Sequence, residues 1–161
     1  FFKAIAPAQL LAFSTSSSAA TLPVTMECVT EKVGVDEEVS SFVLPLGATV
    51  NMDGTSLYQA VAAIFIAQAM LPVPLDLQTQ LMIVVTATLA SIGSAAVPSA
   101  GMVMLVIVLG QAGIPEAGLA LIFAIDRPLD MCRTVVNVTS DCTIATIVAK
   151  SVGKLKTPEN F

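Results

Sequence analysis

Six strongly polar side chains near the end of the chain fall on one face of a predicted helix. Counted from the first of them, the others stand at +4, +7, +8, +11 and +15. At about 100° per residue these positions lie within an arc of roughly 100°. Carboxylate, amide and hydroxyl oxygens suit small hard cations, and a guanidinium is a two-pronged partner for a carboxylate. This face could therefore bind cations together with a carboxylate-bearing solute; its members are Asp126, Asp130, Arg133, Thr134, Asn137 and Asp141.

A second polar group interrupts an apolar run. In LGATVNMDGTSLY (46–58), the word NMDGT stands between the apolar stretches SFVLPL and QAVAAIFIAQAM. It is either a surface turn between two soluble helices or a break in a membrane-spanning helix that binds a ligand. Irregular backbone at membrane depth is tolerated only where it is buried in protein or lines a wet cavity. The second explanation fits an apolar chain better.

Composition favours a membrane protein. Of 161 residues, 55% are apolar and 12% are charged, and the mean hydropathy is +0.86. In soluble domains about 45–50% of the residues are apolar and about 25% are charged. A soluble helical core remains the alternative. The net charge of −5 does not suggest a nucleic-acid partner. With no His, a Ser-His-Asp hydrolase is excluded and no enzyme is expected. Three Cys form no disulfide or zinc pattern, and we expect packed, inert thiols.

Apolar segments and polar tips alternate in two similar halves. A helix over 1–13 would cover roughly 20 Å, about two-thirds of a bilayer's hydrocarbon core, so the short segments re-enter instead of crossing. Paired interrupted segments indicate a transporter binding site. We expect an all-α membrane protein with two re-entrant helical hairpins and two interrupted transmembrane helices in an inverted repeat. The segments are a hairpin (1–34), an interrupted helix (40–72), a second hairpin that serves as a gate (78–113), a second interrupted helix (117–151) and a basic tail (152–161).

Ionisable groups inside such a helix need partners, because each costs about 2.5–3.5 kcal/mol at the membrane centre. An internal ion pair between Asp130 and Arg133 is one explanation of the polar face. It leaves Asp126, Asp141 and Asp53 without cations, and we therefore favour bound cations. Cations plus a carboxylate-bearing solute is a symport chemistry. The serine tip STSSS adds hydroxyls and free N–H groups at half-helix starts, where anions bind.

Four motifs carry a resemblance: SSSAATLPVT, LPLGATVNMDGTSLYQ, TATLASIGSAAVPSAG and DMCRTVVNVTSD. In this order they resemble the glutamate/aspartate:sodium symporters, a family of dicarboxylate/amino acid:cation symporters that includes the excitatory amino acid transporters. The resemblance implies that residues 1–161 are the C-terminal part of the moving transport domain, with the seventh and eighth transmembrane helices. It also implies sodium-coupled uptake of L-aspartate or L-glutamate by an elevator mechanism. The sequence begins at Phe1 without Met, and we therefore expect it to be a piece of a longer polypeptide.

The same resemblance implies the assembly and its location. The family works as a homotrimer in the cell membrane, multi-pass and in contact with lipid, in a bacterial inner membrane or a plasma membrane. The expected ligands are a small acidic amino acid and co-transported sodium ions.

The resemblance also assigns the substrate pocket. Arg133 would hold the side-chain carboxylate of the substrate, and Asp130 would take its amino group. The remaining contacts would come from Thr134, Asn137, Thr55, the backbone at Ser16, Ser17 and Ser18, and the backbone from Val97 to Gly101.

Three sodium sites follow from the same motifs. The first would use Asp141 with the carbonyls of Gly47, Asn51 and Asn137. The second would use Thr49 with the carbonyls of Ser91, Ile92 and Ser94. The third would use Asp53 and Asn51 with an earlier helix that lies outside this sequence.

Five positions depart from the family pattern. Ser16 and Met131 stand where members carry a second arginine. Ala96 and Ser99 stand where glycine is usual, which predicts a stiffer gate tip, and Pro128 is unusual in the eighth helix. Three alternatives remain open. A carrier of C4-dicarboxylates from the same family would not need Asp130 as an amino-group partner. An ion channel or a non-transporting membrane subunit would fit the polar face, although paired hairpins favour a carrier.

Overall fold

The structure is a computed structural model that describes residues 1–156. Within them the chain is all-helical, as expected, apart from one isolated β-bridge between Val35 and Leu155. The α-helices are α1 (Phe2–Thr15), α2 (Ser18–Glu27), α3 (Glu37–Val50), α4 (Asp53–Met70), α5 (Leu77–Ser91), α6 (Ala100–Gln111), α7 (Leu119–Phe123) and α8 (Asp126–Ser151). A π-helical turn, η1 (Cys28–Val33), follows α2, and a 3₁₀ turn, η2 (Glu116–Gly118), precedes α7.

In residues 1–156, every helix falls short of the combined length and apolar character that crossing a membrane requires. The re-entrant hairpins, the inverted repeat and the segment boundaries therefore stay predictions. Of the predicted tail 152–161, the last part, 157–161, lies outside the described residues.

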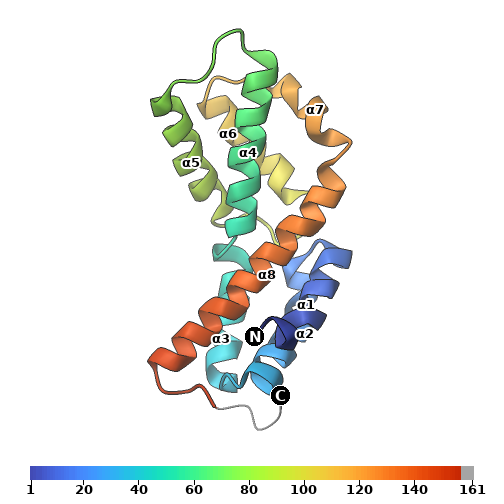
Figure 1. Cartoon of the computed structure of the whole chain (residues 1–161), viewed down its shortest axis with the longest axis vertical. Coiled ribbons are helices and arrows are strands. Elements are labelled where there is room, and N and C mark those ends of the chain that lie inside the picture. The colour runs from blue at the N-terminus through green and yellow to red at the C-terminus, as the bar shows by residue number, and fades with distance from the viewer. Residues whose placement is uncertain (157–161) are drawn as a thin grey trace.

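Two apolar cores are arranged along the molecule, and α8 runs from its middle along the lower one (Figure 1). In one half, α1, α2, η1 and α3 pack with the second half of α8 around Ile5, Leu44 and Val138. In the other, α4, α5, α6 and α7 pack around Ile66 and Leu105. The six polar residues of the predicted face on α8 are all buried, which confirms the helical periodicity. The polar groups thus lie between and beside two apolar cores.

The helices break where the sequence supplies local polar substitutes for helical hydrogen bonds. Between α1 and α2, Ser16 adopts a left-handed conformation with φ 52°. The Ser17 side chain then caps α2 by accepting a hydrogen bond from the Ala20 N–H. Between α3 and α4, Asn51 and Met52 leave the helical region, and α4 begins at Asp53.

The segment predicted as the second interrupted helix is divided near its start. Helix α7 ends at Phe123 and α8 begins at Asp126. Pro128 lies in the first turn of α8, where the missing N–H would have no helical partner in any case. The new helix start is therefore compatible with the proline, whereas a continuous helix would lose a hydrogen bond there.

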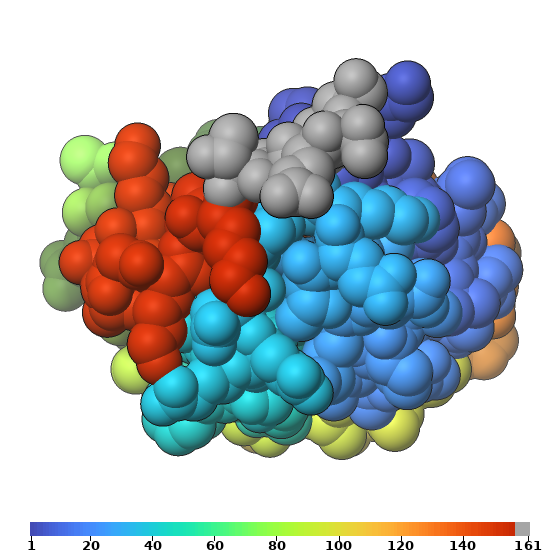
Figure 2. All heavy atoms as spheres, turned by 90° about the horizontal axis from the view of Figure 1, so that it is seen from below, coloured from blue at the N-terminus to red at the C-terminus, as the bar shows by residue number. Residues whose placement is uncertain are grey.

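The chain beyond α8 turns back and clasps the loop before α3. The Asp36 N–H donates to the Lys154 carbonyl at 3.0 Å, and the Lys156 N–H donates to the Gly34 carbonyl at 2.8 Å. Lys154 also forms an ion pair with Glu38, which raises the pKa of Lys154. Figure 2 shows this end of the molecule, with the end of α8 (red) beside α3 (cyan). The clasp joins the end of α8 to the base of the α1–α2 hairpin.

This clasp predicts a strong requirement for glycine at position 34. Gly34 has φ +90°, and a Cβ there would lie 2.4 Å from the Lys156 carbonyl oxygen. Gly34→Ala should lower the free energy of unfolding by about 2 kcal/mol or more, because left-handed strain and a backbone clash add.

The matched control is Gly153→Ala, which has φ +71° but nothing within 4 Å of the added Cβ. It should cost only the strain, about 1–2 kcal/mol. Thermal melting of the purified full-length protein compares the two variants. Equal losses would show that the contact with Lys156 contributes nothing.

Candidate functional site

Three irregular segments meet against the middle of α8: the α1–α2 tip, the α3–α4 break and the α5–α6 tip. The Ser17 hydroxyl donates to the Ala96 carbonyl at 2.7 Å, so the two tips touch. The Gly93 N–H donates to the Thr49 carbonyl at 3.0 Å, which joins the α5–α6 tip to the end of α3. Residues predicted from separate motifs therefore come together in one place.

Asn137 of α8 holds the start of α4. Its Oδ1 accepts from the Gly54 N–H at 2.8 Å and the Thr55 N–H at 3.3 Å, and its Nδ2 donates to Thr55 Oγ1 at 3.1 Å. The first N–H groups of a helix have no partner within it, and here one buried amide supplies it. Gly54 allows the close approach, since a Cβ there would lie 2.4 Å from the Arg133 carbonyl oxygen.

Asp130 and Arg133 form a buried ion pair one turn apart on α8. The other carboxylate oxygen of Asp130 accepts from the Ser99 N–H at 2.7 Å, at the start of α6. Ser99 has φ 63°, the left-handed conformation that favours glycine, which is usual there in the family resembled. The internal ion pair, considered above as the less favoured explanation of the polar face, is thus present in the structure.

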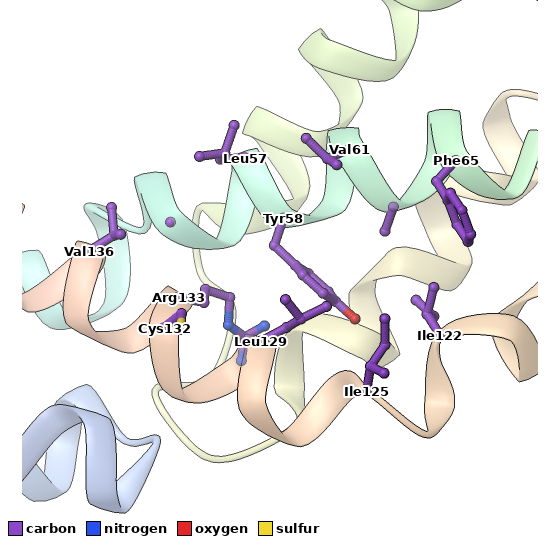
Figure 3. Close-up of a pocket in the computed structure, with 12 residues that line it drawn as sticks. Leu57, Tyr58, Val61, Phe65, Ile122, Ile125, Leu129, Cys132, Arg133 and Val136 are labelled. Carbon is purple, nitrogen blue, oxygen red and sulfur yellow. The ribbon is translucent and has the colours of Figure 1, made fainter.

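Tyr58 is a site residue that the motif analysis missed. Its hydroxyl donates to Asp126 at 2.7 Å, and its ring centroid lies 5.5 Å from the Arg133 guanidinium carbon. In Figure 3 the Tyr58 ring projects from α4 toward the segment that carries Arg133. Asp126 was expected to take a cation as its partner; in the structure it accepts a hydrogen bond from the neutral phenol, and the cation stays a prediction. A lone tyrosine three residues after Thr55 was the only available signal.

A second cluster surrounds Asp141. Its Oδ1 accepts from the Asn51 side-chain amide at 2.9 Å, and the same amide donates to the Ser140 hydroxyl at 3.0 Å. A Cβ at Gly47 would lie 2.5 Å from Asp141 Oδ1, so the carboxylate lies directly against the α3 backbone. Three of the residues predicted for the first sodium site, Asp141, Asn51 and Gly47, therefore lie together, and Ser140 is an addition to them. The fourth, Asn137, contacts Gly54 and Thr55 instead.

The other predicted site residues differ in exposure. Asp53 and Val97 are exposed, and Thr49 turns its hydroxyl back to the Leu46 carbonyl at 3.1 Å. Ser91 and Ser94 are buried, while Ile92 between them is exposed. Ser16 and Ser18 are buried at the α1–α2 tip. Within residues 1–156 the carboxylate of Asp53 accepts no hydrogen bond, and the Ser56 hydroxyl bonds to its backbone carbonyl.

Comparison of the sequence with known proteins identifies a family. The model of a family described as the sodium:dicarboxylate symporter family matches residues 1–151. The chain belongs to this family.

Similar proteins are several excitatory amino acid transporters. Excitatory amino acid transporter 5 of Homo sapiens is 50% identical over 149 residues, which cover 92% of this chain and 26% of that protein. Excitatory amino acid transporter 2 of Homo sapiens is 51% identical over 148 residues, which cover 92% of this chain and 26% of that protein. An excitatory amino acid transporter of Caenorhabditis elegans is 51% identical over 148 residues, which cover 92% of this chain and 29% of that protein. The chain therefore spans about a quarter of the length of these relatives.

In this member of the symporter family, Arg133 lines two cavities of different character. One is an apolar groove of about 380 Å³ between α4 and the α7–α8 segment, lined by side chains such as Leu57, Phe65 and Ile125 (Figure 3). The exposed Cys132 also lines it, so the expectation of three packed thiols holds only for Cys28 and Cys142. The groove offers little to bind a polar solute.

The other cavity lies within the polar cluster and measures about 10 Å³, roughly the least that holds one water. Residues 94–97 of the α5–α6 tip line it together with Ser16, Thr55, Arg133 and Asn137. Its polar lining fits a polar solute, and its size requires the tip to move before one enters.

Gly101 keeps the space that the Arg133 side chain occupies. A Cβ at Gly101 would lie 1.4 Å from Arg133 Nη1, so Gly101→Ala should displace the guanidinium from Asp130. We expect the free energy of unfolding to fall by about 1–3 kcal/mol, the usual cost of overpacking. The measurement is thermal melting of the purified full-length protein.

The control is Gly110→Ala on the same helix, where the added Cβ meets nothing within 4 Å. That change should be neutral or stabilise by up to about 1 kcal/mol, because alanine is the better helix former. A Gly101→Ala protein as stable as Gly110→Ala would contradict the assigned path of the arginine.

Proposed function

We propose that the protein to which this chain belongs is a sodium-coupled symporter of an acidic amino acid, L-aspartate or L-glutamate. The observation that carries the proposal is the buried pair of Arg133 and Asp130, located between the two tips and the α3–α4 break. An arginine matches a carboxylate in geometry and charge, and an aspartate matches an ammonium group. An acidic amino acid carries both groups.

Substrate binding exchanges protein contacts for equivalent contacts to the solute. The side-chain carboxylate of the substrate takes the guanidinium of Arg133, and its amino group takes the Asp130 carboxylate. Thr134, Asn137 and Thr55 add neutral donors and acceptors beside them. A buried ion pair opened without replacement would leave uncompensated charge. The substrate supplies the replacement for both partners at once, which favours a solute that carries both charges.

Entry of the substrate requires the α5–α6 tip to move, because the polar cavity is so small. A few hydrogen bonds hold the tip: Ser17 and Ala19 donate to Ala96, Ser99 donates to Asp130, and Gly93 donates to Thr49. Asp130 changes partner when the substrate ammonium arrives, so its hold on Ser99 weakens. In this proposal the α5–α6 segment is the gate, and the backbone from Val97 to Gly101 and at Ser16 to Ser18 lines the pocket once it has opened.

Sodium ions are co-transported substrates in this proposal. Asp141 with the carbonyls of Gly47, Asn51 and Asn137 would hold one ion, supported by the contacts of Asp141 to Asn51 and to the Gly47 backbone. Thr49 with the carbonyls of Ser91, Ile92 and Ser94 would hold a second, supported by the Gly93–Thr49 hydrogen bond. The exposed Asp53, with Asn51, would complete a third site with parts of the longer protein.

The proposal extends to the whole protein, of which this chain is about a quarter by the length of its relatives. We place residues 1–161 in the transport domain, with re-entrant hairpins at 1–34 and 78–113 and interrupted membrane helices at 40–72 and 117–151. The protein would be a multi-pass homotrimer in the cell membrane, surrounded by lipid, with an elevator motion of this domain. The exposed apolar side chains of α4, α5 and α6, including Phe65, Leu81 and Val103, support contact with lipid or with the rest of the protein.

The decisive measurement is uptake of labelled aspartate into liposomes that contain the full-length protein, with and without an inward sodium gradient. We expect concentrative, sodium-dependent uptake that glutamate inhibits and alanine does not. Uptake without sodium dependence would reject symport. An electrical conductance that does not saturate with substrate would indicate the channel alternative.

A carrier for C4-dicarboxylates is the second candidate, favoured by the description of the family. Asp130→Asn separates the two, because it removes the anionic partner of an amino group and leaves Arg133 for carboxylates. For an amino acid carrier, we expect the half-saturating aspartate concentration to rise by about 30-fold or more. Two results together would favour the dicarboxylate: succinate inhibits uptake by the wild type, and the Asp130→Asn variant still takes up succinate.

A further inference from the structure

One hydroxyl on α8 behaves differently from the others. Serine and threonine hydroxyls within helices usually donate back to a carbonyl of the preceding turn. Those of Thr134, Thr139, Thr143 and Thr146 do so, with distances of 2.9, 2.7, 2.8 and 2.7 Å. Along α8, which is described throughout, Ser140 makes no such bond, and its contact is with the Asn51 side-chain amide from the α3–α4 break at 3.0 Å.

Asn51 therefore has two acceptors for its two amide protons. Its Nδ2 donates to Ser140 Oγ at 3.0 Å and to Asp141 Oδ1 at 2.9 Å. An amide has two donor hydrogens in one plane, so two acceptors fix both the rotamer and the direction of the side-chain oxygen. With Asp141 alone the amide could still rotate about that single contact. Ser140 thus removes the remaining freedom of Asn51.

The backbone of Asn51 is the part of the chain where α3 ends. Its N–H donates to the Gly47 carbonyl at 2.8 Å, and its own φ and ψ of −97° and 70° point its carbonyl out of the helix. Fixing the side chain of Asn51 therefore also restrains the backbone of the break. In the proposed function the carbonyl oxygens of Asn51 and Gly47 surround the first sodium ion together with Asp141.

We propose that Ser140 is a positioning residue of the cation site at Asp141. It holds the Asn51 amide, and through it the backbone oxygen of the break, in place for a sodium ion. This inference rests on the proposed function and deepens it, since it concerns the cation that drives uptake. The hydroxyl acts as an acceptor, so its removal weakens cation binding without changing the charge of the site.

The test uses the full-length protein and the variant Ser140→Ala. We expect the half-saturating sodium concentration for aspartate uptake to rise by about 2- to 10-fold, the equivalent of one net hydrogen bond. The half-saturating aspartate concentration at saturating sodium, and the maximal rate, should stay unchanged. Ser140→Thr keeps the hydroxyl and should restore the sodium dependence.

The matched control is Thr143→Ala, which removes an exposed hydroxyl one turn later that bonds only within α8. It should leave the sodium dependence as in the wild type. A second readout is the rise in melting temperature that sodium causes in the purified protein, since a ligand that binds the folded state stabilises it. Ser140→Ala should need 2- to 10-fold more sodium for the same rise.

The outcomes separate the two proposals. If wild-type uptake depends on sodium and Ser140→Ala leaves both sodium readouts unchanged, the role of Ser140 is wrong and the proposed function stands. An equal change in Thr143→Ala would also reject it, since loss of any α8 hydroxyl would then suffice. If sodium drives no wild-type uptake and causes no rise in melting temperature, the proposed function fails and the inference fails with it.

Discussion

The structure depends on how the charge of one buried guanidinium is compensated. Arg133 is 7% exposed and is the only cation within residues 1–156 whose side chain is buried. Isolated buried charge is very costly, so its surroundings must supply countercharge and space. Asp130 supplies the countercharge, and the Tyr58 ring lies near the guanidinium. Gly101, which has no side chain, leaves the space that the guanidinium occupies. Three helices are thus adapted to a single side chain.

The same constraint explains why Asp130 has several contacts. One carboxylate oxygen pairs with Arg133, and the other accepts from the backbone of Ser99 at the start of α6. The carboxylate therefore neutralises the arginine and caps a helix whose own N-terminal residue contributes no side-chain cap. Charge compensation and the closed position of the α5–α6 tip are linked through one side chain. A ligand that competes for Asp130 would necessarily weaken the hold on that tip.

The sequence predicted much of this arrangement, within clear physical limits. Helical periodicity placed the six polar residues of α8 on one face, because that face is a local property of 3.6 residues per turn. The partner of Asp126 could not be found in this way, since Tyr58 is 68 residues away and meets it only through tertiary packing. The role of Ser140 could not be predicted for the same reason, because Ser140 and its partner Asn51 are 89 residues apart in the sequence. The residue at which α7 ends and α8 begins could not be located, because hydropathy continues across the division and only Pro128 marks it.

The two polar clusters are connected through the α3–α4 break, and this gives the proposed symport a structural basis. Asn137 holds the break from the α4 side, through Gly54 and Thr55, and Asp141 holds it one turn later from the α3 side, through Asn51. Both act from the rigid framework of α8, so the break has little freedom to satisfy one while losing the other. A cation that orders the Asn51 side would leave less disorder to remove when a solute binds beside Thr55, and such coupling must be reciprocal. In the proposed function, sodium and the acidic amino acid would therefore each favour the binding of the other without any direct contact between them.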